Sequence, residues 1–299
     1  MGVHPMIPGF KPMLASPVTT PNMIRFPVYL SEKLDGIRAE TLDGKLVSRR
    51  LKAIPNNHVR STLESLTLPD LDGELIVGAP NLETTLYTTS SAVMSRDGKP
   101  DFQFYVFDII RKGIPFRERF APLIELVDVY PCIKIVTQTL VHNLEELEAY
   151  EELTVGNGYE GIMIRSVTGP YKFGRSTENE GWLLKLKRFV DEEAIVIGFE
   201  EKYHNANIAT KDALGHSKRS SHQANLVPMG TLGALVCESP KYKFQIRVGT
   251  GMDDRLRQLI WNNKPKYINK MVTYRRQEKG GKDKPRHAAF RMWRDKIDI

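Results

Sequence analysis

One lysine stands in a setting that favours nucleophilic chemistry. Residues 32–38 read Glu-Lys-Leu-Asp-Gly-Ile-Arg and follow the short apolar run Val28–Leu30. A strand that ends in a glycine-containing turn can hold the Lys33 amine at the mouth of a pocket. A deprotonated lysine amine is a good nucleophile toward phosphorus, and positive neighbours or burial favour that form. A turn of Lys, Asp and Gly is also common on protein surfaces, so this segment alone leaves both explanations open.

Three further segments place charges at the ends of apolar runs. Asp72–Glu74 lies between apolar residues, and Glu160 and Arg165 flank another apolar run. Lys185 and Lys187 alternate with leucines, so both amines point to one face of a strand. Each segment alone is also explained by a turn or a salt bridge. Together, two carboxylates, three lysines and two arginines describe a site for a nucleoside triphosphate and a metal ion.

The surrounding elements would position these residues. The β-branched and aromatic run 104–110 predicts a buried strand, and short strands are expected at 161–165 and 183–187. Helical spacing covers 117–129 and stops before a proline. Asn143 followed by Glu146 predicts a capping box that starts a helix running to Leu153.

The texture of the chain changes after Phe189. Strands are expected at 194–199, 231–238, 243–248 and 271–275, with one helix at 253–261. This set fits a five-stranded barrel of the OB type, whose faces commonly bind nucleic acid. The polar stretch 203–228 between two of these strands is long enough to be a functional or disordered loop. We therefore expect two domains, 1–189 and 190–299.

Charge is distributed unevenly between these halves. The net charge is +7, yet residues 1–189 carry 22 Lys or Arg against 23 Asp or Glu, while residues 190–299 carry 21 against 13. A basic domain beside a neutral one indicates a polyanionic partner, although a solvated basic surface explains the charge equally well. The cysteines Cys132 and Cys237 are scattered, which excludes a disulfide framework and disfavours a zinc site. Three histidines, His204, His216 and His222, share the polar stretch, where phosphate contact or solvation is favoured over metal binding.

The segments, in this order, resemble the motifs of the covalent nucleotidyltransferases, the superfamily of ATP-dependent DNA ligases, RNA ligases and capping enzymes. The resemblance covers nearly the whole chain. It implies an α+β fold: an adenylation (nucleotidyltransferase) domain with antiparallel sheets and flanking helices, followed by a C-terminal OB-fold β-barrel. It implies an ATP-dependent DNA ligase of the minimal two-domain type, which seals nicks in DNA replication, repair and recombination.

The resemblance also implies a role for each motif residue. Lys33 would become adenylated, and Glu32 and Arg38 beside it would contact the nucleotide. Phe107 would stack on adenine, and Arg49 would contact the nick phosphate or the ribose region. Four residues would serve the phosphates, ribose and metal: Glu74 near ribose and metal, Glu160 at the metal, and Lys185 and Lys187 at the α-phosphate.

The C-terminal segment 286–296 resembles the last motif of ligases, which lies in the OB domain. It departs from the commonest form, because Ala288 stands where a proline is usual and one acidic residue is missing. The resemblance implies that Arg286, Arg294 and Lys296 contact the nucleotide and, with Asp295, orient the leaving pyrophosphate.

Related enzyme classes fit less well. A capping guanylyltransferase usually has Asp-Gly where this chain has Glu160-Gly161, and RNA ligases often have Asn or Ser where Arg38 stands. NAD-dependent ligases usually add a nicotinamide-binding domain and a cysteine zinc module, for which the short lead-in and two cysteines leave no room. A non-enzymatic OB-type nucleic-acid binder would explain the basic tail but not the filled charge pattern.

The expected cofactors are ATP and Mg²⁺ or Mn²⁺, and the expected partner is nicked duplex DNA. Arg49, Lys211, Lys218 and Arg219 are expected to contact that DNA. No apolar run is long enough to span a bilayer and no signal-peptide pattern opens the chain, so we expect no membrane association. A monomer in the cytoplasm of a bacterial or virus-infected cell, not secreted, is the expected state.

Overall fold

The structure is a computed structural model that describes residues 8–18, 21–82, 84–126, 129–187, 189–239, 241, 244–277 and 288–294. The chain divides by its contacts into two compact units. The first contains residues 1–187 and 211–216, and the second contains residues 188–210 and 217–299. This division falls two residues before the end of the expected first domain, and it assigns a six-residue segment from the second half of the chain to the first unit.

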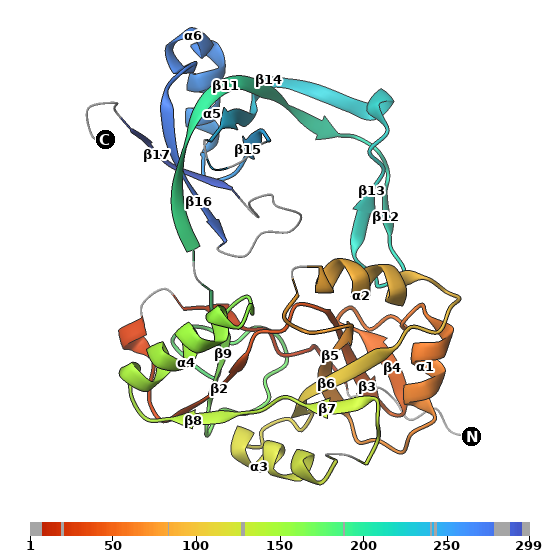
Figure 1. The fold of residues 1–299 in the computed structure, drawn as a ribbon. Coiled ribbons are helices and arrows are strands. Elements are labelled where there is room, and N and C mark those ends of the chain that lie inside the picture. Colours follow the sequence, from red (N-terminus) through yellow and green to blue (C-terminus); the bar gives the residue numbers. More distant parts are fainter. Residues whose placement is uncertain are drawn as a thin grey trace. The chain divides into compact units, whose positions relative to one another are not determined.

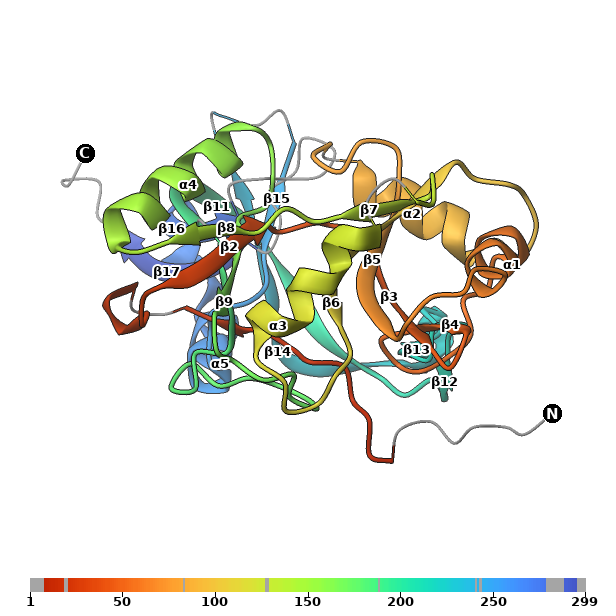
Figure 2. The ribbon, with the colours of Figure 1, turned by 90° about the horizontal axis from the view of Figure 1, so that it is seen from below.

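One sheet of the first unit has the strand order β1-β10-β9-β2-β8. Helix α4 (Leu144–Gly156) covers β2 and β8 (Figures 1 and 2), and Leu147 is buried against Val28 and Ile164 in the core below it. The helix starts as expected, because the Asn143 side chain accepts the Glu146 N–H at 2.9 Å. The strands are β1 (Ser16–Pro17), β2 (Val28–Glu32), β8 (Thr139–Val141), β9 (Ile162–Ser166) and β10 (Leu183–Leu186), and the short 3₁₀ helix η1 (Pro21–Met23) precedes β2.

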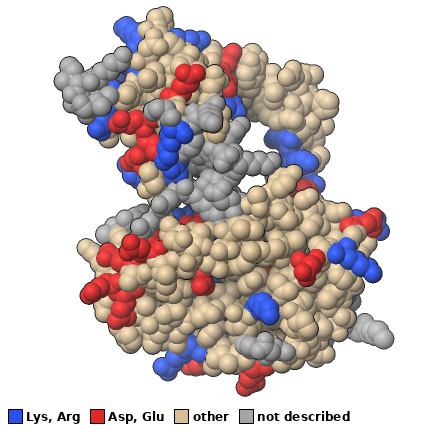
Figure 3. Space-filling model, viewed as in Figure 1, with Lys and Arg blue, Asp and Glu red and all other residues tan. Residues whose placement is uncertain are grey.

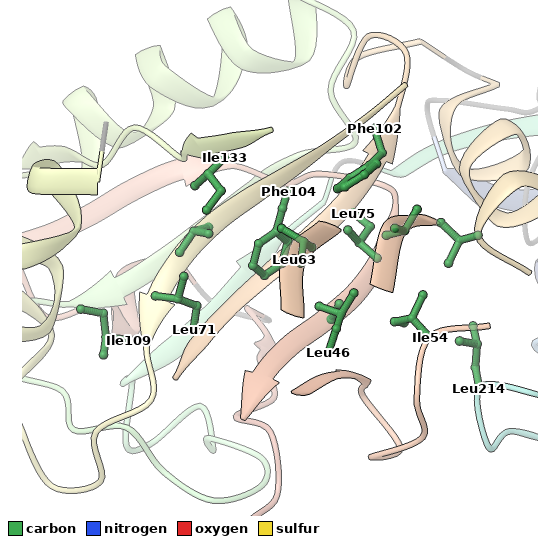
Figure 4. Packing of buried hydrophobic residues seen from close by; sticks show 14 of the residues in the cluster. Leu46, Ile54, Leu63, Leu71, Leu75, Phe102, Phe104, Ile109, Ile133 and Leu214 are labelled. Carbon is green, nitrogen blue, oxygen red and sulfur yellow. The ribbon is translucent and has the colours of Figure 1, made fainter. Parts of the chain in front are cut away.

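The other sheet of this unit has the order β4-β3-β5-β6-β7. Its core contains Leu46, Leu71, Leu75 and Phe104, all without solvent exposure, and the α1 residue Leu63 packs onto them (Figure 4). The strands are β3 (Ile37–Leu42), β4 (Lys45–Ser48), β5 (Leu71–Val77), β6 (Phe102–Ile109) and β7 (Ile133–Ile135), and helices α1 (Asn57–Glu64) and α2 (Thr85–Met94) pack against this sheet.

Two expectations for this unit need correction. The sheets are mixed and not purely antiparallel, since β1 pairs with β10 and β7 pairs with β6 in parallel. The helix expected at 117–129 is instead α3 (Phe116–Phe120) followed by the 3₁₀ helix η2 (Ala121–Leu126). Pro122 has no N–H to continue the α-helical bonding, which explains the tighter second segment.

The second unit is a five-stranded sheet of order β15-β14-β11-β16-β17. A bridge between Thr250, just after β15, and Ala289, at the start of β17, joins the two edges of the sheet. This closure makes the barrel that the sequence predicts, with α5 packed on β14. The elements are β11 (Phe189–Asn205), β14 (Leu226–Glu238), β15 (Ile246–Val248), α5 (Asp254–Asn262), α6 (Lys264–Tyr267), β16 (Met271–Gln277) and β17 (Ala289–Arg294).

The polar stretch 203–228 is largely a β-ribbon and not an irregular loop. Strands β11 and β14 stay paired out to Asn205 and Leu226. They continue into the hairpin β12 (Ala209–Lys211) and β13 (Ser217–Arg219), and the 3₁₀ turn η3 (Gln223–Asn225) leads back to β14 (Figure 1). The buried Asn207 amide donates to the carbonyls of Ser220 and His222, which holds the base of the hairpin together.

In the part of the chain that the structure describes, no helix is long and apolar enough to cross a membrane.

Candidate active site

The first unit contains a pocket of about 370 Å³, a size typical of small-molecule sites. Its wall includes six Lys or Arg side chains and three carboxylates, so the lining favours an anion. The cations are Lys33, Arg38, Arg49, Arg165, Arg175 and Lys185, and the acids are Glu32, Asp35 and Glu74.

Lys33 lies directly after β2, and both its backbone and its side chain contact the segment Glu160-Gly161. Its backbone N–H donates to the Gly161 carbonyl at 2.8 Å, and its Nζ lies 2.5 Å from Glu160 Oε2. The other Glu160 oxygen pairs with Lys187 Nζ. Burial alone raises the pKa of Glu160, but Lys33 and Lys187 outweigh it and lower the pKa to about 2. The carboxylate is therefore a permanent anion between two amines at neutral pH.

Gly161 is required for this arrangement. Its φ of +147° is a conformation that L side chains rarely adopt, and an added Cβ would lie 2.2 Å from the Leu186 carbonyl oxygen. The close approach brings Glu160 and the end of β10 together, and so brings Lys187 to Glu160. The pattern Glu-Gly followed by an apolar strand thus has a packing reason as well as a chemical one.

A β-bulge sets the position of Phe107. Asp72 and Gly73 of β5 pair with Asp108 and Val106 of β6, which leaves Phe107 as the extra residue. A bulge of this kind turns a side chain away from the regular alternation. The Phe107 ring lines the pocket and lies 5.5 Å from the Arg38 guanidinium and 5.3 Å from that of Arg165. It offers a flat apolar surface to a purine.

The arginines beside this ring are fixed by buried carboxylates. Arg38 makes a two-pronged contact with Asp72, with Nε–Oδ1 at 2.9 Å and Nη2–Oδ2 at 2.6 Å. Tyr171 also donates its hydroxyl to Asp72 at 2.7 Å. Arg165 donates one hydrogen bond from Nη1 to Asp108 Oδ2 at 2.7 Å, and Asp108 is itself held by a two-pronged contact with the buried Arg119. These pairs set the guanidinium planes before any ligand binds.

The carboxyl of Glu74 faces the pocket from β5. Burial raises its pKa to about 7, although Lys33, Arg38 and the Gly36 N–H, which donates to Oε1 at 3.1 Å, oppose the rise. A carboxyl with a pKa near 7 can, in its ionised form, accept a hydrogen bond from a ribose hydroxyl. Burial, together with Lys187 and Lys33, lowers the pKa of Lys185. Lys185 therefore sits where an arriving phosphate would relieve repulsion between amines.

The structure brings most predicted site residues together. Those that line the pocket are Glu32, Lys33, Arg38, Arg49, Glu74, Phe107 and Lys185. Glu160 and Lys187 join them through Lys33. Arg286, Asp295 and Lys296 lie outside the described residues. Arg294 lies on β17 in the second unit, 2.9 Å from Glu193, so no contact with the pocket is assigned to it. Lys218 and Arg219 lie on strand β13 of the hairpin, and Lys211 ends β12.

The predicted site did not include Arg175, Leu14 or Ala15. All three line the pocket, and Arg175 Nη1 donates to the Ala15 carbonyl at 2.5 Å. Leu14 forms a parallel bridge with Arg175, which brings the lead-in segment beside the pocket. Residues 12–15 read Pro-Met-Leu-Ala and resemble a ligase lead-in, which is a weak signal, and nothing in the local pattern marked Arg175.

Comparisons with known proteins agree with this architecture. Residues 12–187 match the family described as the ATP dependent DNA ligase domain, and residues 227–294 match the DNA ligase OB-like domain. The structure of Chlorella virus DNA ligase-adenylate is similar, with 30% identity, a TM-score of 0.55 and coverage of 96% of this chain and 99% of that chain. A Lig E DNA ligase structure gives 26% identity, a TM-score of 0.68 and coverage of 95% and 99%.

Proteins that are similar in sequence are also DNA ligases or DNA ligase-like proteins. A prophage-derived DNA ligase-like protein of Bacillus subtilis is 30% identical over 193 residues, or 58% of this chain and 66% of its own length. A DNA ligase of Methanosphaera stadtmanae is 26% identical over 271 residues, which cover 82% of this chain and 45% of that protein. The chain thus spans about half to two thirds of the length of these two relatives.

The fold and pocket define a covalent nucleotidyltransferase with an OB-like second unit. The chain belongs to the family of ATP-dependent DNA ligases, which confirms the family and the fold predicted from the sequence.

Proposed function

We propose that this chain seals nicks in duplex DNA in three transfers that pass through an adenylated Lys33. The observation that carries the proposal is that Lys33, in an ion pair with Glu160, lines a pocket rich in cationic side chains. A simple nucleotide-binding site would need no lysine next to a carboxylate and a second amine. We further propose that the enzyme acts as a monomer in the cytoplasm.

In the first transfer, Lys33 loses a proton to solvent, its neutral Nζ attacks the α-phosphorus of ATP, and the bond from that phosphorus to the bridging oxygen breaks so that pyrophosphate leaves with the electron pair. Lys185 lies on the same pocket wall and would neutralise charge that develops on the α-phosphate oxygens. Phe107 would stack on adenine, and Glu74 would accept a hydrogen bond from a ribose hydroxyl. Such chemistry depends on positioning and electrostatics more than on general base catalysis.

The pocket region offers two carboxylates, Glu160 and Glu74, as ligands for Mg²⁺. In the part of the chain that the structure describes, no group of three or more His, Cys, Asp or Glu is placed to hold a metal. Glu160 Oε2 is buried without a hydrogen-bond partner apart from the ion pair to Lys33, so it becomes available once Lys33 is a neutral phosphoramide. Glu160, with Glu74 as a second carboxylate, would then hold Mg²⁺ together with phosphate and water oxygens. A bound Mg²⁺ supplies positive charge that stabilises phosphate oxygens.

In the second transfer, an oxygen of the nick 5′-phosphate attacks the same phosphorus and Lys33 leaves as the amine. In the third, the 3′-hydroxyl loses its proton to solvent as its oxygen attacks the activated 5′-phosphate, and AMP leaves with the bonding electron pair. Arg49, at the pocket wall directly after β4, would bind the nick phosphate in both steps. The acidic side chains over α4, which carries Glu145, Glu146, Glu148 and Glu152 on its exposed face (Figure 3), make that face unsuitable for DNA.

The decisive experiment combines covalent labelling with sealing. Incubation with ATP labelled at the α-phosphate and Mg²⁺ should give a labelled protein, and a nicked DNA duplex should then discharge the label as AMP and be sealed. Matched nicks with RNA on the 3′-hydroxyl or 5′-phosphate side test the RNA ligase alternative. A protein that binds nicked DNA but acquires no covalent label would be a binding module, and the proposal would fail.

A further inference from the structure

Part of the pocket wall comes from the tip of the β12–β13 hairpin. Residues 211–216 pack with the first unit, and Leu214 and His216 line the pocket together with Ser48 and Arg49. Leu214 and Ser48 are 166 positions apart in sequence. The steps proposed above leave these tip residues without a role.

The tip is anchored in the first unit by packing and by one hydroxyl group. The Leu214 side chain is only 4% exposed and belongs to the core cluster that contains Leu46 and Ile54. Ser48 Oγ donates to the Leu214 carbonyl at 2.9 Å and accepts the backbone N–H of Lys52 at 3.3 Å. The same serine therefore ties the hairpin tip to the turn that carries Arg49.

The turn at the tip is tight and lies against residues 50–52. Gly215 has a φ of +83°, and its N–H donates to the Asp212 carbonyl at 3.0 Å. A Cβ at Gly215 would lie 2.8 Å from the Lys52 side chain and 2.9 Å from that of Arg50. Both the turn and the close approach require glycine here.

Asp212 orients the His216 ring. Asp212 Oδ1 accepts the His216 backbone N–H at 2.8 Å, and Oδ2 lies 3.3 Å from the imidazole Nδ1. A carboxylate on Nδ1 leaves Nε2 as the free end of the ring. In its imidazolium form His216 donates from both nitrogens, so Nε2 can donate to a second anion.

We propose that the hairpin tip is part of the reaction pocket and that His216 binds the 5′-phosphate of the nick beside Arg49. This inference rests on the proposed function, because it is the nick transfer that brings a second phosphate to the pocket. Lys185 would meet the AMP phosphate on Lys33, which leaves Arg49 and His216, two other residues that line the pocket, for the second phosphate. His216 is then dispensable for self-adenylation, in which no nick phosphate takes part.

The test compares nicks that differ by one phosphate. The full-length protein is adenylated with ATP, freed of metal with EDTA, and titrated with nicked duplexes that carry either a 5′-phosphate or a 5′-hydroxyl. The variants are His216→Ala, His216→Gln and, as a matched control, His142→Ala, which changes an exposed histidine outside the pocket. Each protein is brought to full adenylation before the titration, and H142A, whose side chain lies outside the pocket, should reach it at the wild-type rate.

The wild type and H142A should bind the 5′-phosphate nick more tightly than the 5′-hydroxyl nick. H216A should lose about tenfold of this preference while keeping its affinity for the 5′-hydroxyl nick, as expected for one hydrogen bond to a charged group. H216Q, a neutral donor, should recover part of the loss. An unchanged preference in H216A, an equal fall in both affinities, or no preference in the wild type would overturn the inference. A wild-type protein that does not seal nicks would instead overturn the proposed function.

Discussion

The Nζ of Lys33 lies 2.5 Å from Oε2 of Glu160, so the proposed nucleophile rests as half of a buried ion pair. Glu160, with a pKa of about 2, cannot accept a proton at neutral pH, and it is therefore a poor general base. Its second oxygen already pairs with Lys187. An incoming triphosphate must redistribute these charges before the amine can attack.

Replacing Lys33 by Ala or Arg should abolish covalent AMP labelling. Arginine keeps the positive charge beside Glu160, but a guanidinium does not deprotonate in proteins and cannot act as the nucleophile. Labelling with ATP marked at the α-phosphate, followed by denaturing electrophoresis, measures the result. Lys45→Ala, at an exposed lysine outside the pocket, is the matched control and should label normally. Covalent label on K33A at another lysine would contradict the assignment.

Replacing Lys185 by Ala should slow self-adenylation by about 10²–10³-fold, the usual cost of losing one donor to a developing oxyanion. Single-turnover labelling at saturating ATP measures the rate of the chemical step. K45A again serves as the control. A K185A enzyme whose apparent affinity for ATP falls while its maximal rate is preserved would show that Lys185 binds the ground state and the transition state equally.

Replacing Glu74 by Gln should change the pH dependence of stability. The folded-state pKa of Glu74 is about 7, above the ordinary carboxyl value of 4.5, so its favourable contribution is complete below about pH 4.5 and is lost as pH rises through 7. E74Q stays neutral, so its free energy of unfolding relative to the wild type should rise between pH 5 and pH 8. This relative free energy of unfolding should rise by about 2 kcal/mol. That is somewhat less than the free energy equivalent to the whole pKa shift, because the side chain is only partly buried.

Urea unfolding at pH 5 and pH 8 measures this difference. Glu148→Gln, on the exposed face of α4, should show no such change between the two pH values. A stability difference between E74Q and the wild type that is the same at both pH values would mean that Glu74 is already ionised at pH 5.

The sequence predicted those parts of the site that depend on local pattern. The positions of Lys33, Glu160 and Lys185 were predictable because a charged residue interrupts or follows an apolar run at each of them. Phe107 was chosen by resemblance, but its exposure to the pocket depends on a bulge that no local pattern marks. Arg175 was missed because its place at the pocket results from a bridge to Leu14 across the whole domain.

Contacts between residues distant in sequence also explain where the prediction of the fold was wrong. The ribbon that continues β11 and β14 is polar, exposed and rich in poor strand formers, so propensity favoured a loop. Pairing between strands distant in sequence holds it in β structure instead. The helix after Phe116 was shortened by a proline whose effect on hydrogen bonding competes with good helical spacing.

Replacing Lys218 by Ala should reduce the salt dependence of nicked-DNA binding. Lys218 is exposed on β13, and a lysine that neutralises one phosphate contributes about 0.9 to the slope of log affinity against log salt. Fluorescence anisotropy over a range of salt concentrations gives the slope, with K45A as the control. Equal slopes for K218A and the wild type would show that the hairpin strand makes no contact with the DNA backbone at this position.

The position of Arg294 on β17 allows two explanations of its role. Strand β17 closes the barrel, and Arg294 Nε lies 2.9 Å from Glu193 Oε1, an arrangement that a purely structural arginine would also have. The resemblance implies instead that Arg294 orients the leaving pyrophosphate, a group needed only in the first transfer. Under that role, Arg294→Ala should lose self-adenylation by about 10²-fold or more. It should still seal a nick that already carries 5′-AMP at close to the wild-type rate.

Glu193→Gln separates the two explanations, because it breaks the same ion pair and leaves the arginine in place. The pair is half exposed, so its loss alone should cost little stability. If the role is catalytic, E193Q should self-adenylate like the wild type while R294A does not. If R294A and E193Q show the same rates in both assays, or if R294A loses both steps equally, then Arg294 serves the barrel and takes no part in the chemistry.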